Sequence, residues 1–87
     1  MNNLLGHLYV SLAGRDKGCI CAVVGIPEDE GYVLIADGKL RKVELPKKKK
    51  LKHLKPIDWE PLTEDKLTNR FIREAVNAYT EQGSDSI

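Results

Sequence analysis

The sequence predicts a small, mainly β protein: a barrel of short strands followed by one C-terminal helix. Three observations predict it. Apolar and polar residues alternate near the N-terminus, glycine-containing turns separate several short apolar runs, and apolar residues recur at helical spacing near the C-terminus. The chain has 87 residues, the size of one domain. A barrel is expected rather than an open sheet, because closure removes exposed strand edges.

Four strands are expected in the first half of the chain. Residues 8–12 alternate with period two, and Leu8, Val10 and Leu12 form the apolar set of a half-buried strand. The other expected strands are residues 19–26, 32–36 and 42–45. Polar segments that contain glycine separate the first three strands, and Asp37-Gly38 is a strong turn signal before the fourth.

The last third of the chain predicts one amphipathic helix over residues 63–82. Thr63 is the expected N-cap, because a threonine hydroxyl can accept a hydrogen bond from the first turn. The apolar stripe of this helix consists of Leu67, Phe71, Ala75, Val76 and Tyr79. Arg70 and Glu74 are four residues apart and can form an ion pair. A tail of residues 83–87, which opens with a glycine, is expected to end the helix and to fray.

The expected organisation is a barrel of residues 1–56, a linker of residues 57–62 and the helix. Trp59, the single tryptophan, is expected to pack the linker or the helix onto the barrel. The apolar stripe is most simply the face by which the helix docks on the barrel. The alternative is that the stripe is a recognition surface for a protein partner.

Positive charge is concentrated in one short segment. Residues 39–55 carry nine basic residues and one acidic residue, whereas residues 1–38 have a formal charge of −3 and residues 56–87 one of −4. Such a segment is typical of proteins that bind a polyanion. The alternative is a solvated charged face, and DNA or an anionic membrane surface would satisfy the same physics as RNA.

Two prolines, Pro46 and Pro56, bracket the lysine-rich part of this segment. Neither fits the middle of a central strand or helix, so we expect a turn followed by a short edge strand near residues 52–55. Leu51 and Leu54 would anchor this segment to the barrel while its lysines face water.

The composition argues against several other classes of protein. The longest nearly uninterrupted apolar run, residues 19–26, is too short to span a membrane, and the N-terminus has no secretion signal. Cys19 and Cys21 suit a reducing cytoplasm and are expected to pack as small apolar groups. With His7 and His53 they could form a zinc site, but Cys-x-Cys is not the usual zinc-knuckle spacing. No nucleophile lies in a recognisable catalytic motif, so we expect no enzyme, cofactor, metal or small-molecule substrate.

The run Val10-Ser11-Leu12-Ala13-Gly14-Arg15-Asp16-Lys17-Gly18, followed by an apolar strand, resembles the KOW motif. Gly18 matches the defining glycine of that motif. The continuation through residues 32–38 and the basic tract resembles the bacterial KOW-domain RNA-binding proteins, which are related to the eukaryotic and archaeal large-subunit ribosomal protein family numbered fourteen. The resemblance covers residues 6–56 well and the helix only loosely. It implies an SH3-like β-barrel and binding to RNA or to the ribosome.

The chain departs from this family at one position. Many relatives carry a basic residue directly after the Lys-Gly pair, whereas Cys19 follows Gly18 here. More of any RNA binding therefore falls on residues 39–55.

The candidate RNA-binding residues are the basic side chains of the loop and the tract. They are Arg15, Lys17, Lys39, Arg41, Lys42, Lys47, Lys48, Lys49, Lys50, Lys52 and Lys55. The residues expected to shape the loop are Gly14, Asp16 and Gly18. The loop could equally be a turn with no ligand. We expect a cytoplasmic protein that binds RNA, such as ribosomal RNA, or the ribosome. The competing hypothesis is a protein-interaction module of the translation or transcription machinery.

Overall fold

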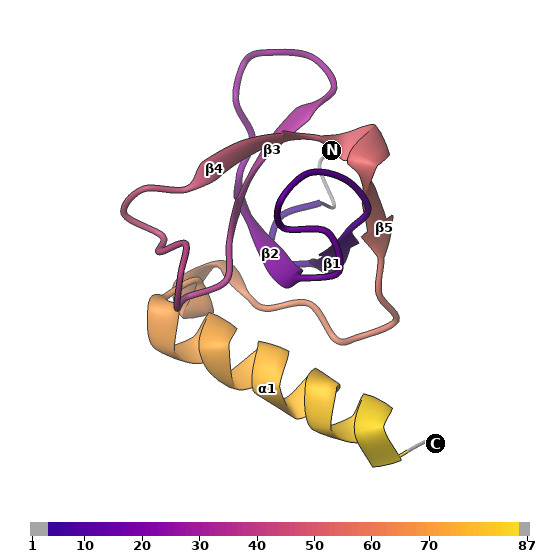
Figure 1. Cartoon of the computed structure of the whole chain (residues 1–87). Helices are drawn as coiled ribbons and strands as arrows, with labels where there is room; N and C mark the ends of the chain where they lie inside the picture. The colour runs from indigo at the N-terminus through magenta and orange to yellow at the C-terminus, as the bar shows by residue number, and fades with distance from the viewer. Residues whose placement is uncertain (1–3, 86–87) are drawn as a thin grey trace.

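The computed structural model describes residues 4–85 and contains a five-stranded antiparallel sheet with one C-terminal helix, α1 (Figure 1). The strands are β1 (Leu8–Ser11), β2 (Ile20–Gly25), β3 (Tyr32–Ala36), β4 (Lys47–Lys50) and β5 (Leu54–Pro56). The helical elements are the 3₁₀ turns η1 (Leu51–His53) and η2 (Glu64–Lys66) and the helix α1 (Asn69–Asp85). The mainly β prediction with a C-terminal helix is confirmed.

The sheet is strongly curved but open. Its strand order is β4-β3-β2-β1-β5, so β4 and β5 are the two edges, and the short turn η1 connects them. The predicted closure into a barrel is therefore not confirmed. The sheet nevertheless curves around an inner apolar cluster that includes Tyr9, Val23, Val33 and Leu54.

The expected fourth strand at residues 42–45 is wrong. This segment is a turn, and the lysine run Lys47–Lys50 forms the strand instead. The Asp37 carboxylate accepts hydrogen bonds from the backbone N–H groups of Lys39 and Arg41, at 2.9 and 2.8 Å. These bonds close a turn immediately after β3, and the rest of the loop up to Pro46 then leads the chain back to pair with β3.

The two faces of β1 are used differently from the expected pattern. Tyr9 and Ser11 point into the inner cluster or its rim and are buried, whereas Leu8 is buried on the opposite face and Leu12 is 47% exposed. The strand is covered on both sides because α1 packs on the outer face of the sheet. A period-two pattern cannot identify the inner face in that case.

A second apolar cluster joins this outer face to the helix. It contains Leu8, Ala22 and Ile72, each fully buried, with Val76 and Trp59 packed against them. Docking of the helix on the sheet, which was the simpler of the two expectations, is therefore confirmed. The expected stripe was wrong in detail, because Ile72 lies at its centre and Phe71 is 38% exposed.

The helix boundaries also differ from the predicted range 63–82. Thr63 precedes the 3₁₀ turn η2, where its hydroxyl bonds to the Asp65 carboxylate, and Thr68 precedes α1. The Thr68 hydroxyl accepts a hydrogen bond from the backbone N–H of Phe71, as an N-cap does. The helix continues through Gly83 to Asp85, so Gly83 does not end it. The rest of the expected frayed tail, residues 86–87, lies outside the described residues.

The segment expected to be a linker is packed against the rest of the protein. The backbone N–H groups of Ile57 and Leu62 donate to the carbonyls of Leu8 and Gly6. Trp59 meets Tyr79 of α1 edge-on, with ring centroids 5.6 Å apart. The expected role of Trp59 is confirmed. The predicted Arg70–Glu74 ion pair is also present, at 3.3 Å.

Candidate nucleic-acid interface

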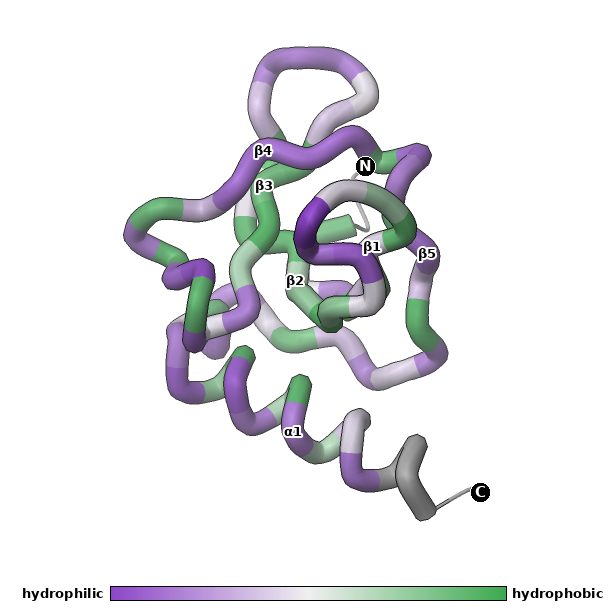
Figure 2. The backbone as a smooth tube through the Cα atoms, viewed as in Figure 1, coloured by the Kyte–Doolittle hydropathy of each residue, from purple (hydrophilic) through white to green (hydrophobic). Residues whose placement is uncertain are grey.

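The basic segment of residues 47–55 lies against the glycine-bounded loop of residues 14–18. Asp16 of the loop forms ion pairs with Lys49 at 2.8 Å and with Lys47 at 3.4 Å. The backbone N–H of Leu12, just before the loop, donates to the carbonyl of His53 at 2.8 Å. Figure 2 shows the hydrophilic path of β4 passing beside the loop between β1 and β2. Two segments more than thirty positions apart in the sequence therefore form one surface.

The lysines of β4 alternate between two faces of the sheet. Lys49 pairs in register with the buried Val33, and its own side chain is only 8% exposed. Its amine donates to the Ala13 carbonyl and to the Asp16 carboxylate, both at 2.8 Å. The aliphatic part of the side chain is therefore buried while its charge is hydrogen-bonded. The expectation that the lysines face water is therefore wrong for Lys49. The expected anchoring of the segment is confirmed, since Leu54 is buried and Leu51 packs against the same cluster.

Asp16 holds the loop in place through its carboxylate. Burial alone would raise the pKa of Asp16, but hydrogen bonds from Lys49 and Ser11, the charge of Lys49 and a hydrogen bond from Lys47 outweigh it and hold the pKa at about 2. The carboxylate is therefore ionised at neutral pH and neutralises part of the charge of β4. The expected structural role of Asp16 is supported, because the Ser11 hydroxyl lies 3.0 Å from one of its oxygens.

Two glycines at the ends of the loop have the left-handed conformation. Gly14 has φ of +84° and Gly18 has φ of +89°. Residues other than glycine adopt these angles only with strain, so these positions fit the predicted role of the glycines in the turn. A Cβ at Gly18 would meet no atom within 4 Å, so the backbone angle alone explains the glycine there.

A third lysine of β4 also has an internal partner. Lys48 pairs with Asp29, and its amine lies 5.1 Å from the centroid of the Tyr32 ring. The three lysines Lys47, Lys48 and Lys49 are thus engaged with carboxylates of the protein itself.

The other eight candidate cations are exposed, and none forms an ion pair with a carboxylate among the side chains described, those of residues 4–81. They are Arg15, Lys17, Lys39, Arg41, Lys42, Lys50, Lys52 and Lys55. We call these residues the free cations. They lie on three segments: the loop of residues 14–18, the turn after β3, and the chain from the end of β4 to β5.

The helix α1 holds the turn after β3 in position. Asn69 accepts the N–H of Val43 at 2.8 Å and donates to the Glu44 carboxylate at 2.9 Å. Arg73 donates to the carbonyl of Gly38 at 3.1 Å. Gly38 has φ of +79° and lies so close to the Asn69 carbonyl that a Cβ would collide with it. The roles of Asn69 and Arg73 were not predicted from the sequence, because contacts across 26 and 35 positions leave no local pattern.

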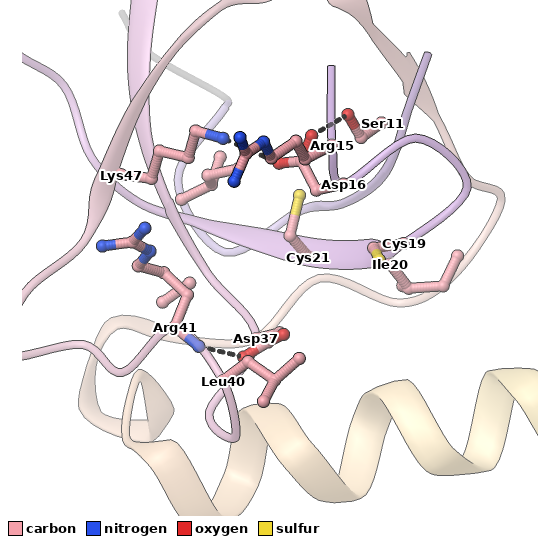
Figure 3. Close-up of a pocket in the computed structure, with 12 residues that line it drawn as sticks. Ser11, Arg15, Asp16, Cys19, Ile20, Cys21, Asp37, Leu40, Arg41 and Lys47 are labelled. Atoms are coloured by element: carbon pink, nitrogen blue, oxygen red, sulfur yellow. Dashed lines mark hydrogen bonds and ion pairs between the residues drawn. The ribbon is translucent and has the colours of Figure 1, made fainter. Parts of the chain in front are cut away.

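A hollow of about 300 Å³ lies between the loop of residues 14–18, the turn after β3 and the start of β4. Figure 3 shows Arg15 and Lys47 on one side of it, Arg41 and Leu40 on another, and Cys21 between them. Burial, reinforced by the negative charges of Asp16 and Asp37, raises the pKa of the Cys21 thiol to about 12. Cys21 is thus a neutral, apolar part of this hollow at physiological pH.

The two cysteines differ in exposure. Cys21 is buried, as expected, whereas Cys19 is exposed and does not pack as an apolar group. The part of the chain that the structure describes contains no group of three or more histidine, cysteine or acidic residues placed to hold a metal ion.

Comparison with protein families and with curated proteins gives no match to this chain. Across residues 4–85, no helix combines the length and the apolar character needed to cross a membrane.

Proposed function

We propose that this protein binds RNA, and that it acts by binding rather than by catalysis. The observation that carries the proposal is that the free cations lie on three neighbouring segments: the loop of residues 14–18, the turn after β3, and the chain from the end of β4 to β5. Lysine and arginine side chains at such positions neutralise phosphates and release the counterions that surround a nucleic acid. Ribosomal RNA, or the ribosome in the cytoplasm, is the proposed target.

The curved sheet supports the same proposal. We assign it to the SH3-like barrels of KOW type, with β4 and β5 as edges that η1 joins without pairing. The KOW-like segment then corresponds to β1, the loop of residues 14–18 and the start of β2. In this assignment the loop presents Arg15 and Lys17 at the mouth of the barrel, beside the basic strand.

The aromatic residues favour contact with the backbone of RNA over stacking on rings. Lys48 covers the Tyr32 ring, and Trp59 packs against Tyr79 beneath the helix. None of these three rings is placed as a platform for successive bases, which sequence-tolerant single-strand binders use. The grip is therefore expected to be electrostatic and to tolerate many sequences.

The competing hypothesis is a protein-interaction module of the translation or transcription machinery, in which the barrel or the helix binds the partner. Ala75 and Val76 of the expected apolar stripe, together with Ile72, are packed on the sheet. The helix therefore has a structural task, and the proposal gives it a second one: it holds the basic turn after β3.

The salt dependence of RNA affinity tests this function. The affinity of the intact protein for a fluorescent single-stranded RNA is measured at several salt concentrations. The triple variant Lys50→Gln, Lys52→Gln, Lys55→Gln should lower the log–log slope by about 2, at about 0.7 per lost phosphate contact. The double variant Arg15→Gln, Lys17→Gln should lower it by about 1.4 by the same rule.

Lys66→Gln is the matched control, because this exposed lysine lies on η2, outside the three segments. It should leave the slope unchanged. An absence of RNA binding, or slopes equal in all variants, would refute the proposal. Co-sedimentation with ribosomes, with and without RNase, then identifies the target.

A further inference from the structure

The hollow between the loop of residues 14–18 and the turn after β3 has an apolar floor. Buried Cys21, Ile35 and Ala36 form this floor, and the exposed Leu40 forms part of one wall. Its volume of about 300 Å³ is at the low end of ligand pockets, which span about 300–1,000 Å³. One flat heterocycle fits such a space, whereas a dinucleotide or a folded peptide does not.

The rim of the hollow is cationic. Arg15, Arg41 and Lys47 line it from three different segments (Figure 3). Arg15 has no hydrogen-bond or ion-pair partner among the side chains of residues 4–81, and Arg41 uses one guanidinium nitrogen to donate to the Leu45 carbonyl at 3.3 Å. Guanidinium planes can stack on a base and can also hold the phosphates on either side of it.

Two carboxylates also line the hollow, but each already has partners in the protein. Asp16 is paired with lysines of β4, and one oxygen of Asp37 accepts two backbone N–H groups of the turn. The lining therefore carries three cations against two carboxylates, a net charge of +1, and Arg15 and Arg41 are the two cations that no carboxylate among the described side chains neutralises. An apolar floor with a cationic rim matches a ligand that is a flat ring joined to phosphates.

We propose that this hollow is a subsite for one unstacked nucleobase of single-stranded RNA, whose flanking phosphates meet Arg15 and Arg41. The inference rests on the proposed function and adds a contact to it. The free cations hold the backbone, and the hollow takes a single base from it. Unstacking a base of a single strand costs little free energy, because no base pair is broken. The subsite therefore favours loops and ends of RNA over duplexes.

The test uses three RNA chains of about eight nucleotides that carry the same phosphates. The first is a ribose-phosphate chain without bases, the second keeps one central base, and the third keeps all bases. The single base should raise the affinity by about 5-fold, the low end of the range for one stacked base, because aliphatic side chains and no aromatic ring line the hollow. The remaining bases should add less than the first one did, and the salt dependence should be equal for the three chains.

A matched pair of variants places the base in the hollow. Leu40 and Leu45 are exposed leucines of the same turn, 87% and 76% exposed, but only Leu40 lines the hollow. Leu40→Ser should remove most of the gain from the single base and leave the affinity for the base-free chain unchanged. Leu45→Ser should change neither affinity.

Alkylation of Cys19 tests independently whether the base binds in the hollow, because this exposed thiol also lines it. The one-base chain should slow its reaction with iodoacetamide at least several-fold more than the base-free chain does. If the base-free chain binds as tightly as the others, the base subsite is refuted while RNA binding by the free cations stands. If none of the three chains binds, RNA binding itself is refuted.

An acidic peptide with one aromatic residue is the competitor from another class of ligand. It should not protect Cys19 at concentrations at which the one-base chain does. Protection by the peptide alone would overturn the inference and favour a protein partner.

Discussion

At the scale of single residues, the lysine run of β4 has two roles: Lys49 is buried and forms an ion pair with Asp16, whereas Lys50 is an exposed cation. Four consecutive lysines suggest a uniform basic surface, yet the pleat of β4 turns them alternately to opposite faces. Lys49 points inward and joins β4 to the loop of residues 14–18. Its charge therefore fixes the loop that carries Arg15 and Lys17, and it is not available to a partner.

Lys49→Met should therefore destabilise the protein. The substitution keeps an apolar stem but removes hydrogen bonds to the Asp16 carboxylate and to the Ala13 carbonyl. We expect a loss of about 1.5–3 kcal/mol in the free energy of unfolding, the range for a hydrogen bond to a charged group. Urea denaturation measures this change.

Lys50→Met is the control. Lys50 is the next residue of the same strand, but it is exposed and has no ion pair with the described side chains of residues 4–81. This change should alter the free energy of unfolding by no more than about 0.5 kcal/mol. Equal losses in the two variants would mean that the buried position of Lys49 has no special role.

The lowered pKa of Asp16 predicts an acid dependence of stability. The folded-state pKa, about 2, is below the ordinary value of 3.8, so the ionised carboxylate stabilises the fold. This contribution is fully present above about pH 4 and is lost as the pH falls through about 2. The sign follows because the unfolded chain binds the proton more tightly than the folded protein does.

Asp16→Asn should remove this part of the acid dependence. We expect the difference in free energy of unfolding between the wild type and the variant to shrink as the pH falls from about 4 to about 2. Denaturation midpoints at a series of pH values measure it. A difference that stays constant over this range would show that the ionised form contributes nothing.

At the scale of elements, α1 covers the outer face of the sheet and holds the turn after β3. The helix would be marginal alone in water, because helices of this length gain most of their stability from packing. Packing of Ile72 on Leu8 and Ala22 supplies that stability. The polar contacts of Asn69 and Arg73 then give the free cations of the turn a defined position.

Ile72→Ala and Phe71→Ala compare neighbouring residues of this helix. Ile72 is fully buried, so its truncation should cost about 2–5 kcal/mol in the free energy of unfolding. Phe71 is partly exposed, so its truncation should cost about 1 kcal/mol or less. Thermal and urea denaturation measure both changes. A larger loss in Phe71→Ala than in Ile72→Ala would contradict the packing of the helix.

At the scale of the whole molecule, positive and negative charge are unevenly distributed. In Figure 1, α1 lies in the lower part of the molecule and the edge strand β4 in the upper part, while the turn after β3 reaches α1. Residues 56–87 have a formal charge of −4, whereas residues 39–55, which hold six of the eight free cations, carry nine basic residues and one acidic residue. This separation should orient the molecule so that the loop and β4, rather than the helix, approach a polyanion.

Local patterns were sufficient to predict much of this protein. The mainly β fold, the third strand at residues 32–36 and the glycine-bounded turn follow from propensities and spacing within a few residues. The uneven charge distribution is likewise a property of the sequence alone. These features depend on neighbours in the chain, so they can be read without knowing how the chain folds back on itself.

Only the tertiary structure decided which lysines are free and which face of each strand is buried. Lys49 is buried because β4 pairs with β3 and brings its amine to Asp16, a residue 33 positions away. Ile72 replaces Phe71 at the helix interface because the sheet has an apolar outer face at Leu8 and Ala22. Strand pairing and helix docking bring distant residues together, and the resulting burial and ion pairing outweigh local preferences in free energy.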